Sequence, residues 1–180
     1  MEAAKPSPMI GGLKWFLDIV WYLLWAVLTV SAVGFLGATL VYLSQVFGWL
    51  PESAASSLRG VIDLVIMLPL LVAEILTLMV IVHRLRLIVR TLIEGDPFVP
   101  ENAGHLRFIA FAIAIYQVVR YAFQGLVAIS LAVFGYRIGG VELAHFDLNL
   151  GPWFAVAALL VLSEVLREGA RMRQEQKLTI

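Results

Sequence analysis

The nonapeptide EGDPFVPEN, residues 94–102, divides this chain into two halves. It holds two prolines, one glycine and three acidic side chains, although 61% of the whole chain is hydrophobic. Gly95 is a favourable helix stop, and Pro97 after it cannot continue a helix. Pro100 suits the first turn of a new helix, where Glu101 would favour the positive end of the helix. The nonapeptide therefore predicts a rigid corner between two helices.

On both sides of this corner, the sequence is apolar enough for an integral membrane protein. Charged residues make up 14% of its 180 residues, against roughly 25% in an ordinary soluble domain. Residues 19–51 contain no charge, and the run is too long for a signal peptide, so it predicts a retained helix. Helices are expected rather than strands because the bilayer offers the backbone no water.

The predicted fold is a four-helix transmembrane bundle, all-α apart from one small hairpin, in a single domain covering residues 1–180. The membrane-spanning helices are predicted at about residues 15–47, 61–94, 101–134 and 150–172. The last of these reaches the ~20 residues needed to cross a bilayer only when its polar flanks are counted.

The positive charges predict the orientation of the chain. Ten Lys and Arg side chains fall in the two tails and in the connector 83–107, whereas the other side has only Arg59 and Arg137. Cytoplasmic segments carry an excess of Lys and Arg. Both termini and the corner at 94–102 are therefore predicted to be cytoplasmic.

The outer segment between the third and fourth helices shows a different pattern. In YRIGGVELAHFDLNL, residues 136–150, hydrophobic and polar residues alternate with one slip, and Gly139-Gly140 is a two-residue turn signal. This alternation predicts a small extracytoplasmic β-hairpin at residues 136–150.

Two charged side chains fall deep inside predicted spans. Glu74 and Arg120 lie at similar distances from the cytoplasmic ends of their helices, and a lone charge at mid-bilayer costs at least ~2.5–3.5 kcal/mol. We therefore predict that they pair inside the bundle. The pair would either fix the register of the helices or act as a proton or ion relay.

A surface for a cytoplasmic protein partner is predicted from the corner and the end of the last helix. Glu164, Arg167, Glu168 and Arg171 recur at helical spacing and form one charged face. This face either pairs with itself near the lipid headgroups or offers a docking surface. The residues assigned to the predicted surface are Arg90, Asp96, Pro97, Phe98, Asn102, Arg107, Glu164, Arg167 and Arg171.

The sequence carries no motif of a known catalytic site. It lacks a Ser-His-Asp arrangement, a P-loop, an HExxH motif and a dinucleotide fingerprint. It also has no cysteine, which excludes thiolate metal sites. His83 and His105 invite a haem hypothesis, but haem requires ligands at matched depth facing a slot. We therefore expect no enzymatic activity, cofactor or metal, and the zero net charge gives no sign of direct nucleic-acid binding.

Two stretches resemble a bacterial family of uncharacterised four-helix inner-membrane proteins. The family's first pattern is a G-[DN]-P-F corner followed by Asn and then Leu-Arg. Its second is an E-[VIL]-[FL]-[RK]-x-[GA] tail with EQ-x-L-T at the end. The matching residues are Gly95, Asp96, Pro97, Phe98, Asn102, Leu106 and Arg107 for the first, and Glu164, Arg167, Gly169, Glu175, Gln176, Leu178 and Thr179 for the second. Members of that family are frequently encoded beside a small helix-turn-helix regulator of the Cro type. The resemblance implies a bacterial inner membrane and a regulatory pairing with such a regulator.

Three function hypotheses follow. The first is a non-enzymatic regulatory or sensory membrane protein that binds a cytoplasmic protein, such as a small transcription regulator. The alternative is a small transporter or accessory channel subunit that uses Glu74 and Arg120. A third hypothesis is a haem-bearing electron carrier. Small-residue pairs such as Gly34 and Ala38 fit either packing inside the bundle or a homo-oligomer.

Overall fold

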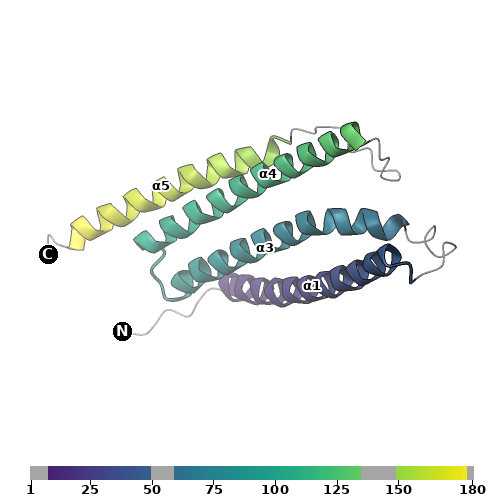
Figure 1. The fold of residues 1–180 in the computed structure, drawn as a ribbon. Coiled ribbons are helices and arrows are strands. Elements are labelled where there is room, and N and C mark those ends of the chain that lie inside the picture. Colours follow the sequence, from purple (N-terminus) through teal and green to yellow (C-terminus); the bar gives the residue numbers. More distant parts are fainter. Residues whose placement is uncertain (1–7, 50–58, 135–148, 178–180) are drawn as a thin grey trace. The chain divides into compact units, whose positions relative to one another are not determined.

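The computed structural model describes residues 8–49, 59–134 and 149–177 (Figure 1). Its helices are α1 (Pro8–Val46), α3 (Arg59–Ile93), α4 (Pro100–Phe134) and α5 (Gly151–Lys177). Within the described ranges, three helical segments are long and apolar enough to cross a membrane. They are Met9–Ser44, Met67–Ile93 and Pro100–Ile129. The chain is therefore a helical bundle with the character of a membrane protein.

The predicted fourth membrane span, α5, is not among these three segments, and it stays a prediction. The apolar part of α5 ends at Ser163, and Glu164, Arg167 and Glu168 follow it. Residues 152–163 would extend only ~18 Å at 1.5 Å per residue, little more than half of a hydrocarbon core of ~30 Å. The sequence prediction reached the required length only by counting polar flanks.

The predicted β-hairpin also needs correction, since no strand occurs in the parts of the chain that the structure describes. At the end of the predicted hairpin, Asn149 accepts a hydrogen bond from the Gly151 N–H at 3.0 Å. This contact is typical of a residue that caps the start of a helix. Residues 149–150 therefore lead into α5, and residues 136–148 of the predicted hairpin lie outside the described residues.

The chain divides into two compact units. Unit 1 consists of Met1–Leu24, Thr77–Gln117 and Asn149–Ile180. It contains the start of α1, the end of α3, the start of α4 and the whole of α5. Unit 2 consists of Trp25–Leu76 and Val118–Leu148, and its buried side chains include Leu68, Ile75 and Val127.

Small side chains form part of the interior of unit 1. Ala103 and Ala110 of α4 and Ala170 of α5 are buried, beside larger residues such as Ile109. Small residues let membrane helices approach each other closely, where van der Waals contacts between backbones stabilise the packing.

The corner between α3 and α4 begins with a left-handed glycine. Gly95 has a φ angle of 81°, its N–H donates to the Leu92 carbonyl at 3.3 Å, and the Asp96 N–H donates to the Thr91 carbonyl at 3.1 Å. This pair of bonds is the Schellman motif, which satisfies carbonyls left free at the end of a helix. The chain therefore leaves α3 in one defined direction before α4 starts at Pro100.

Replacing Gly95 with alanine is expected to lower the free energy of unfolding by about 1–2 kcal/mol, because a Cβ disfavours the left-handed conformation. No atom lies within 4 Å of the added Cβ, so the cost comes from the backbone alone. Gly104→Ala is the control. The space around Gly104 is as open as that around Gly95, but Gly104 lies within helix α4. Alanine there is expected to be neutral or stabilising. Thermal unfolding in detergent, followed by circular dichroism, compares the melting temperatures of the two variants. Equal shifts in melting temperature would contradict this account.

Candidate functional site

The corner is built around the side chain of Asn102, which is only 1% exposed. Its amide nitrogen donates to the Thr91 hydroxyl at 2.6 Å and to the Pro97 carbonyl at 3.0 Å. The Thr91 hydroxyl in turn donates to the Ile88 carbonyl at 2.8 Å. Asn102 therefore ties the start of α4 to the last turns of α3 and holds the corner between them.

Two contacts hold this corner against α5, and we call their four residues the corner clamp: Asp96, Phe98, Gly169 and Arg173. Asp96 forms an ion pair with Arg173. The Phe98 ring lies against Gly169, where a Cβ would meet Phe98 Cδ1 at 3.1 Å. The ion pair is partly solvated and contributes about 0–1 kcal/mol. The contact of the Phe98 ring with Gly169 therefore accounts for much of the packing between the corner and α5.

Another contact joins α4 directly to α5. Glu164 Oε2 accepts a hydrogen bond from Arg107 Nη2 at 3.4 Å. The same carboxylate pairs with Arg167, three residues further along α5. Glu164 therefore joins the two helices and also begins the charged face of α5.

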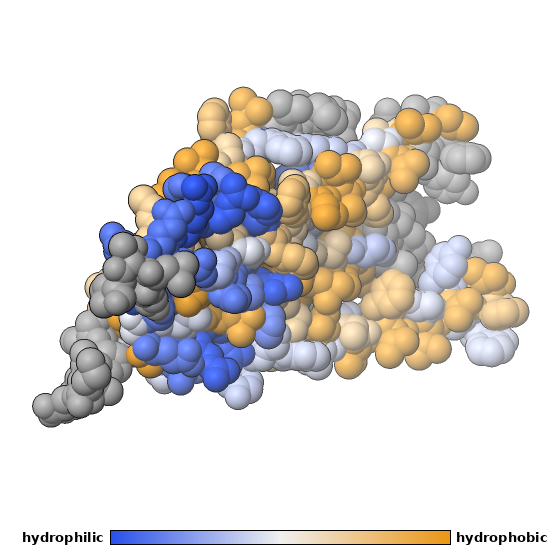
Figure 2. All heavy atoms as spheres, turned by 90° about the vertical axis from the view of Figure 1, so that its left-hand side faces the viewer, coloured by the Kyte–Doolittle hydropathy of each residue, from blue (hydrophilic) through white to orange (hydrophobic). Residues whose placement is uncertain are grey.

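The charged face of α5, which we call the α5 stripe, consists of Glu164, Arg167, Glu168, Arg171 and Glu175. Arg171 lies 3.7 Å from Glu168 and 3.1 Å from Glu175. The hydrogen bond to Glu175 and the charges of Glu168 and Glu175 raise the pKa of Arg171. The five side chains are 51–68% exposed. Figure 2 looks onto this end of unit 1, where hydrophilic side chains gather. The stripe is thus both self-paired and open to solvent.

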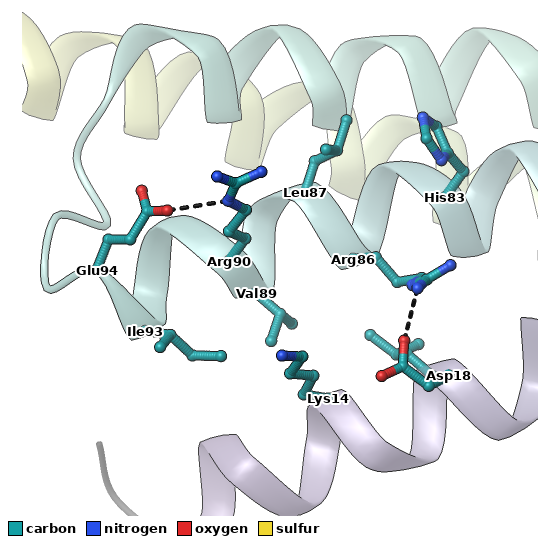
Figure 3. A pocket seen from close by; sticks show the side chains of 10 residues that line it. Lys14, Asp18, His83, Arg86, Leu87, Val89, Arg90, Ile93 and Glu94 are labelled. Carbon is teal, nitrogen blue, oxygen red and sulfur yellow. Dashed lines mark hydrogen bonds and ion pairs between the residues drawn. The ribbon is translucent and has the colours of Figure 1, made fainter. Parts of the chain in front are cut away.

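A cleft of about 490 Å³ lies between α1 and α3 on another side of unit 1 (Figure 3). Arg86 reaches from α3 to Asp18 of α1, with 2.8 Å between Nη2 and Oδ1. Its guanidinium also lies 5.4 Å from the centre of the Trp21 ring. Sequence reasoning missed this cleft. The available signal was Asp18, a charge four residues after Lys14 at the start of the first apolar run.

The histidines of unit 1 have protein contacts of their own. The Arg84 guanidinium lies 3.2 Å from His105 Nδ1 and 4.2 Å from the centre of the Phe108 ring. His83 lies 5.9 Å from Trp21, measured between ring centres. Among the described residues, no group of three or more His, Asp or Glu side chains is arranged to hold a metal ion.

The predicted intramembrane pair belongs to unit 2. Glu74 is exposed on α3, and Arg120 is half-buried on α4. The ion pairs found among the described residues do not include these two side chains. Their pairing stays a prediction.

The nine residues predicted for partner binding all lie in unit 1. Asn102 is buried and the Pro97 carbonyl is its hydrogen-bond partner, so these two shape the corner from within. The other seven remain at least partly exposed and make contacts inside the chain, for instance Arg90 with Glu94 at 2.9 Å. Binding of a partner by these residues stays a prediction.

The comparison with known families agrees with a resemblance to an uncharacterised family. No curated protein and no solved structure is similar enough to match this chain. The family described as "Protein of unknown function (DUF2975)" matches residues 4–180, which is nearly the entire sequence. The chain therefore belongs to the DUF2975 family.

Proposed function

We propose that this protein is a non-enzymatic regulatory protein of a bacterial inner membrane, and that its α5 stripe binds a cytoplasmic protein. Unit 1 would face the cytoplasm, because most Lys and Arg residues of the chain fall in its segments. The start of α1, the corner and the end of α5 all belong to unit 1. This arrangement supports a multi-pass topology with both termini on the cytoplasmic side.

The observation that carries the proposal is the exposed α5 stripe on a helix that is held in place. Exposed ion pairs contribute only about 0–1 kcal/mol each, so a partner could exchange them for pairs with its own charges at little cost. The corner clamp and the link from Glu164 to Arg107 fix α5 against α4. A surface that is already ordered loses less entropy when it binds.

The proposed partner is a small helix-turn-helix transcription regulator. This class follows from the resemblance of the corner and the tail to a family often encoded beside such regulators. Binding would hold the regulator at the membrane. A signal that favours either the bound or the unbound state would change the amount of free regulator.

Crosslinking from the α5 stripe inside living cells tests this proposal. A photo-crosslinking amino acid replaces Glu168 on the stripe, or Phe154 on the apolar part of the same helix as the control. Affinity purification and mass spectrometry identify the products. We expect a small DNA-binding protein from position 168 and none from position 154. Recovery of only copies of this protein, or of the same proteins from both positions, would contradict the proposal.

Matched charge changes then locate the contact. Arg171→Gln removes one positive charge from the stripe and is expected to lower the crosslinking yield from position 168. Gln176→Glu changes the net charge by the same amount at an exposed position of α5 that is not part of the stripe. It is expected to leave the yield unchanged, so equal losses would indicate a general charge effect.

Transport is a second candidate function, favoured by polar groups in unit 2. The exposed Glu74 lies within Met67–Ile93, which can span a membrane, and the Gln124 side-chain oxygen is buried with no hydrogen-bond partner among the described residues. Buried polar groups in membrane helices often mark ion pathways. Purified protein in liposomes with an internal pH dye tests this function. Proton flux that Glu74→Gln abolishes, with unchanged helix content, would support it, and absence of flux in the unmodified protein would rule out proton transport.

A further inference from the structure

The cleft between α1 and α3 has the composition of a binding site for an anion. Three basic side chains and two acidic ones line it, which leaves one net positive charge when His83 is neutral. The five charged side chains are Lys14, Asp18, Arg86, Arg90 and Glu94. Figure 3 shows Lys14 reaching from α1 towards Val89 of α3, across the space between the helices.

The basic groups in the cleft remain available to a ligand. Among the described residues, Lys14 is in none of the ion pairs. Arg86 lies 2.8 Å from the buried Asp18 Oδ1, but about a third of its side chain is exposed. Arg90 pairs only with Glu94 of its own helix, and its side chain is largely exposed. An incoming phosphate could therefore contact Lys14 and Arg90 directly and share Arg86 with Asp18.

The cleft also has an apolar side that continues along the helices. Leu17 and Ile93 line it beside the charged groups. A neighbouring hollow of about 370 Å³ shares His83 with the cleft. It is lined by Trp21, Met79, Val80 and Phe108, together with Arg84. Tryptophan is enriched where membrane meets water. The lining changes from mostly charged to mostly apolar, which matches a molecule with an anionic head and a hydrocarbon tail.

We propose that this cleft binds the headgroup phosphate of an anionic phospholipid, with Lys14, Arg86 and Arg90 as its contacts. An acyl chain of the lipid lies over the hollow at Trp21 and Phe108. The site is on the α1 and α3 side of unit 1 and does not involve the α5 stripe. The inference therefore stands whether or not the stripe binds a regulator.

A membrane lipid fits this site better than free phosphate does. Inorganic phosphate would contact the cations but would leave the apolar lining and the adjoining hollow without a ligand. The cations also lie at one end of segments that can span a membrane, Met9–Ser44 and Met67–Ile93. Basic groups at that height meet the anionic lipids of the adjacent leaflet.

Native mass spectrometry of the purified full-length protein tests the inference. The protein is equilibrated in detergent with equal amounts of phosphatidylglycerol and phosphatidylcholine, and the retained lipid is counted. We expect phosphatidylglycerol to be retained several-fold more than phosphatidylcholine. Lys14→Gln should weaken its retention about fivefold, as removal of one basic contact predicts.

A control and a competitor make the test decisive. Gln176→Glu changes the net charge as Lys14→Gln does, but on α5, and should leave lipid retention unchanged. Excess inorganic phosphate should not displace the bound phosphatidylglycerol. Three results would overturn the inference: equal retention of the two lipids, equal effects of the two substitutions, or displacement of the lipid by phosphate.

Discussion

Asn102→Ala is expected to lower the free energy of unfolding by about 1–3 kcal/mol, because it removes a buried donor that satisfies two acceptors. The side chain is almost fully buried and donates to Thr91 and Pro97. Alanine leaves the Pro97 carbonyl without this donor and opens a space where the corner meets α3. Thermal unfolding in detergent, followed by circular dichroism, measures the loss.

The direction of the hydrogen bonds gives this prediction a sharper form. The Thr91 hydroxyl already donates to the Ile88 carbonyl, so it can only accept from residue 102, and the Pro97 carbonyl also only accepts. Asn102→Asp keeps nearly the same shape but replaces the donor with a carboxylate that faces two acceptors. We therefore expect Asn102→Asp to be at least as destabilising as Asn102→Ala.

The neighbouring Glu101→Ala is the control for both substitutions. Glu101 is exposed in the first turn of α4, and its favourable interaction with the helix end contributes about 0.3–1 kcal/mol. If Asn102→Ala and Glu101→Ala lower the melting temperature equally, the buried amide does not hold the corner. If Asn102→Asp is milder than Asn102→Ala, the assigned direction of the hydrogen bonds is wrong.

Local chemistry explains what the sequence could predict about the corner. A helix stop at Gly95 depends on the backbone freedom of one residue, and a helix start at Pro100 depends on one fixed φ angle. Both can be read from neighbouring residues alone. Neighbouring residues do not show which helix packs against the corner, because the contact of Phe98 with Gly169 joins positions far apart in the chain. The helical spacing of the stripe gave no indication that Arg173, on another face of α5, pairs with Asp96.

The start of α5 shows why the hairpin was predicted wrongly. Apolar residues that alternate over a short segment resemble a strand, yet Asn149 followed by Gly151 and Pro152 is also a signal for the start of a helix. The structure follows the capping signal at Asn149. The same helix carries charges from Glu164 onward, which leaves the predicted fourth span with few apolar residues.

The predicted intramembrane pair, which stays a prediction, shows a different limit of what a sequence can give. Counting residues places Glu74 and Arg120 at similar heights, because each helical residue adds a fixed rise. It does not give the rotation of a helix about its axis, which decides the neighbours of a side chain. Glu74 is exposed on α3, and its rotation follows from the packing of the whole helix.

Gly169→Leu is expected to lower the free energy of unfolding by about 1–3 kcal/mol, the usual cost of forcing a larger side chain into a packed site. A Cβ alone would lie 3.1 Å from Phe98 Cδ1 and 3.4 Å from Cε1. The remaining atoms of leucine would push the ring away from α5 and strain the adjacent ion pair of Asp96 with Arg173. The melting temperature in detergent reports the loss. Gly104→Leu, which adds the same side chain in open space on α4, is the control and should cause little loss.

A double-mutant cycle decides whether the Phe98 ring is the cause. Phe98→Ala alone loses the contact with α5, but combined with Gly169→Leu it makes room for the new side chain. The two substitutions should therefore be less destabilising together than the sum of their separate effects, with a coupling of about 0.5–3 kcal/mol. Strict additivity would mean that the ring and α5 do not meet in the folded protein. In that case the corner clamp could not hold α5, and the α5 stripe would lose the fixed position on which partner binding rests.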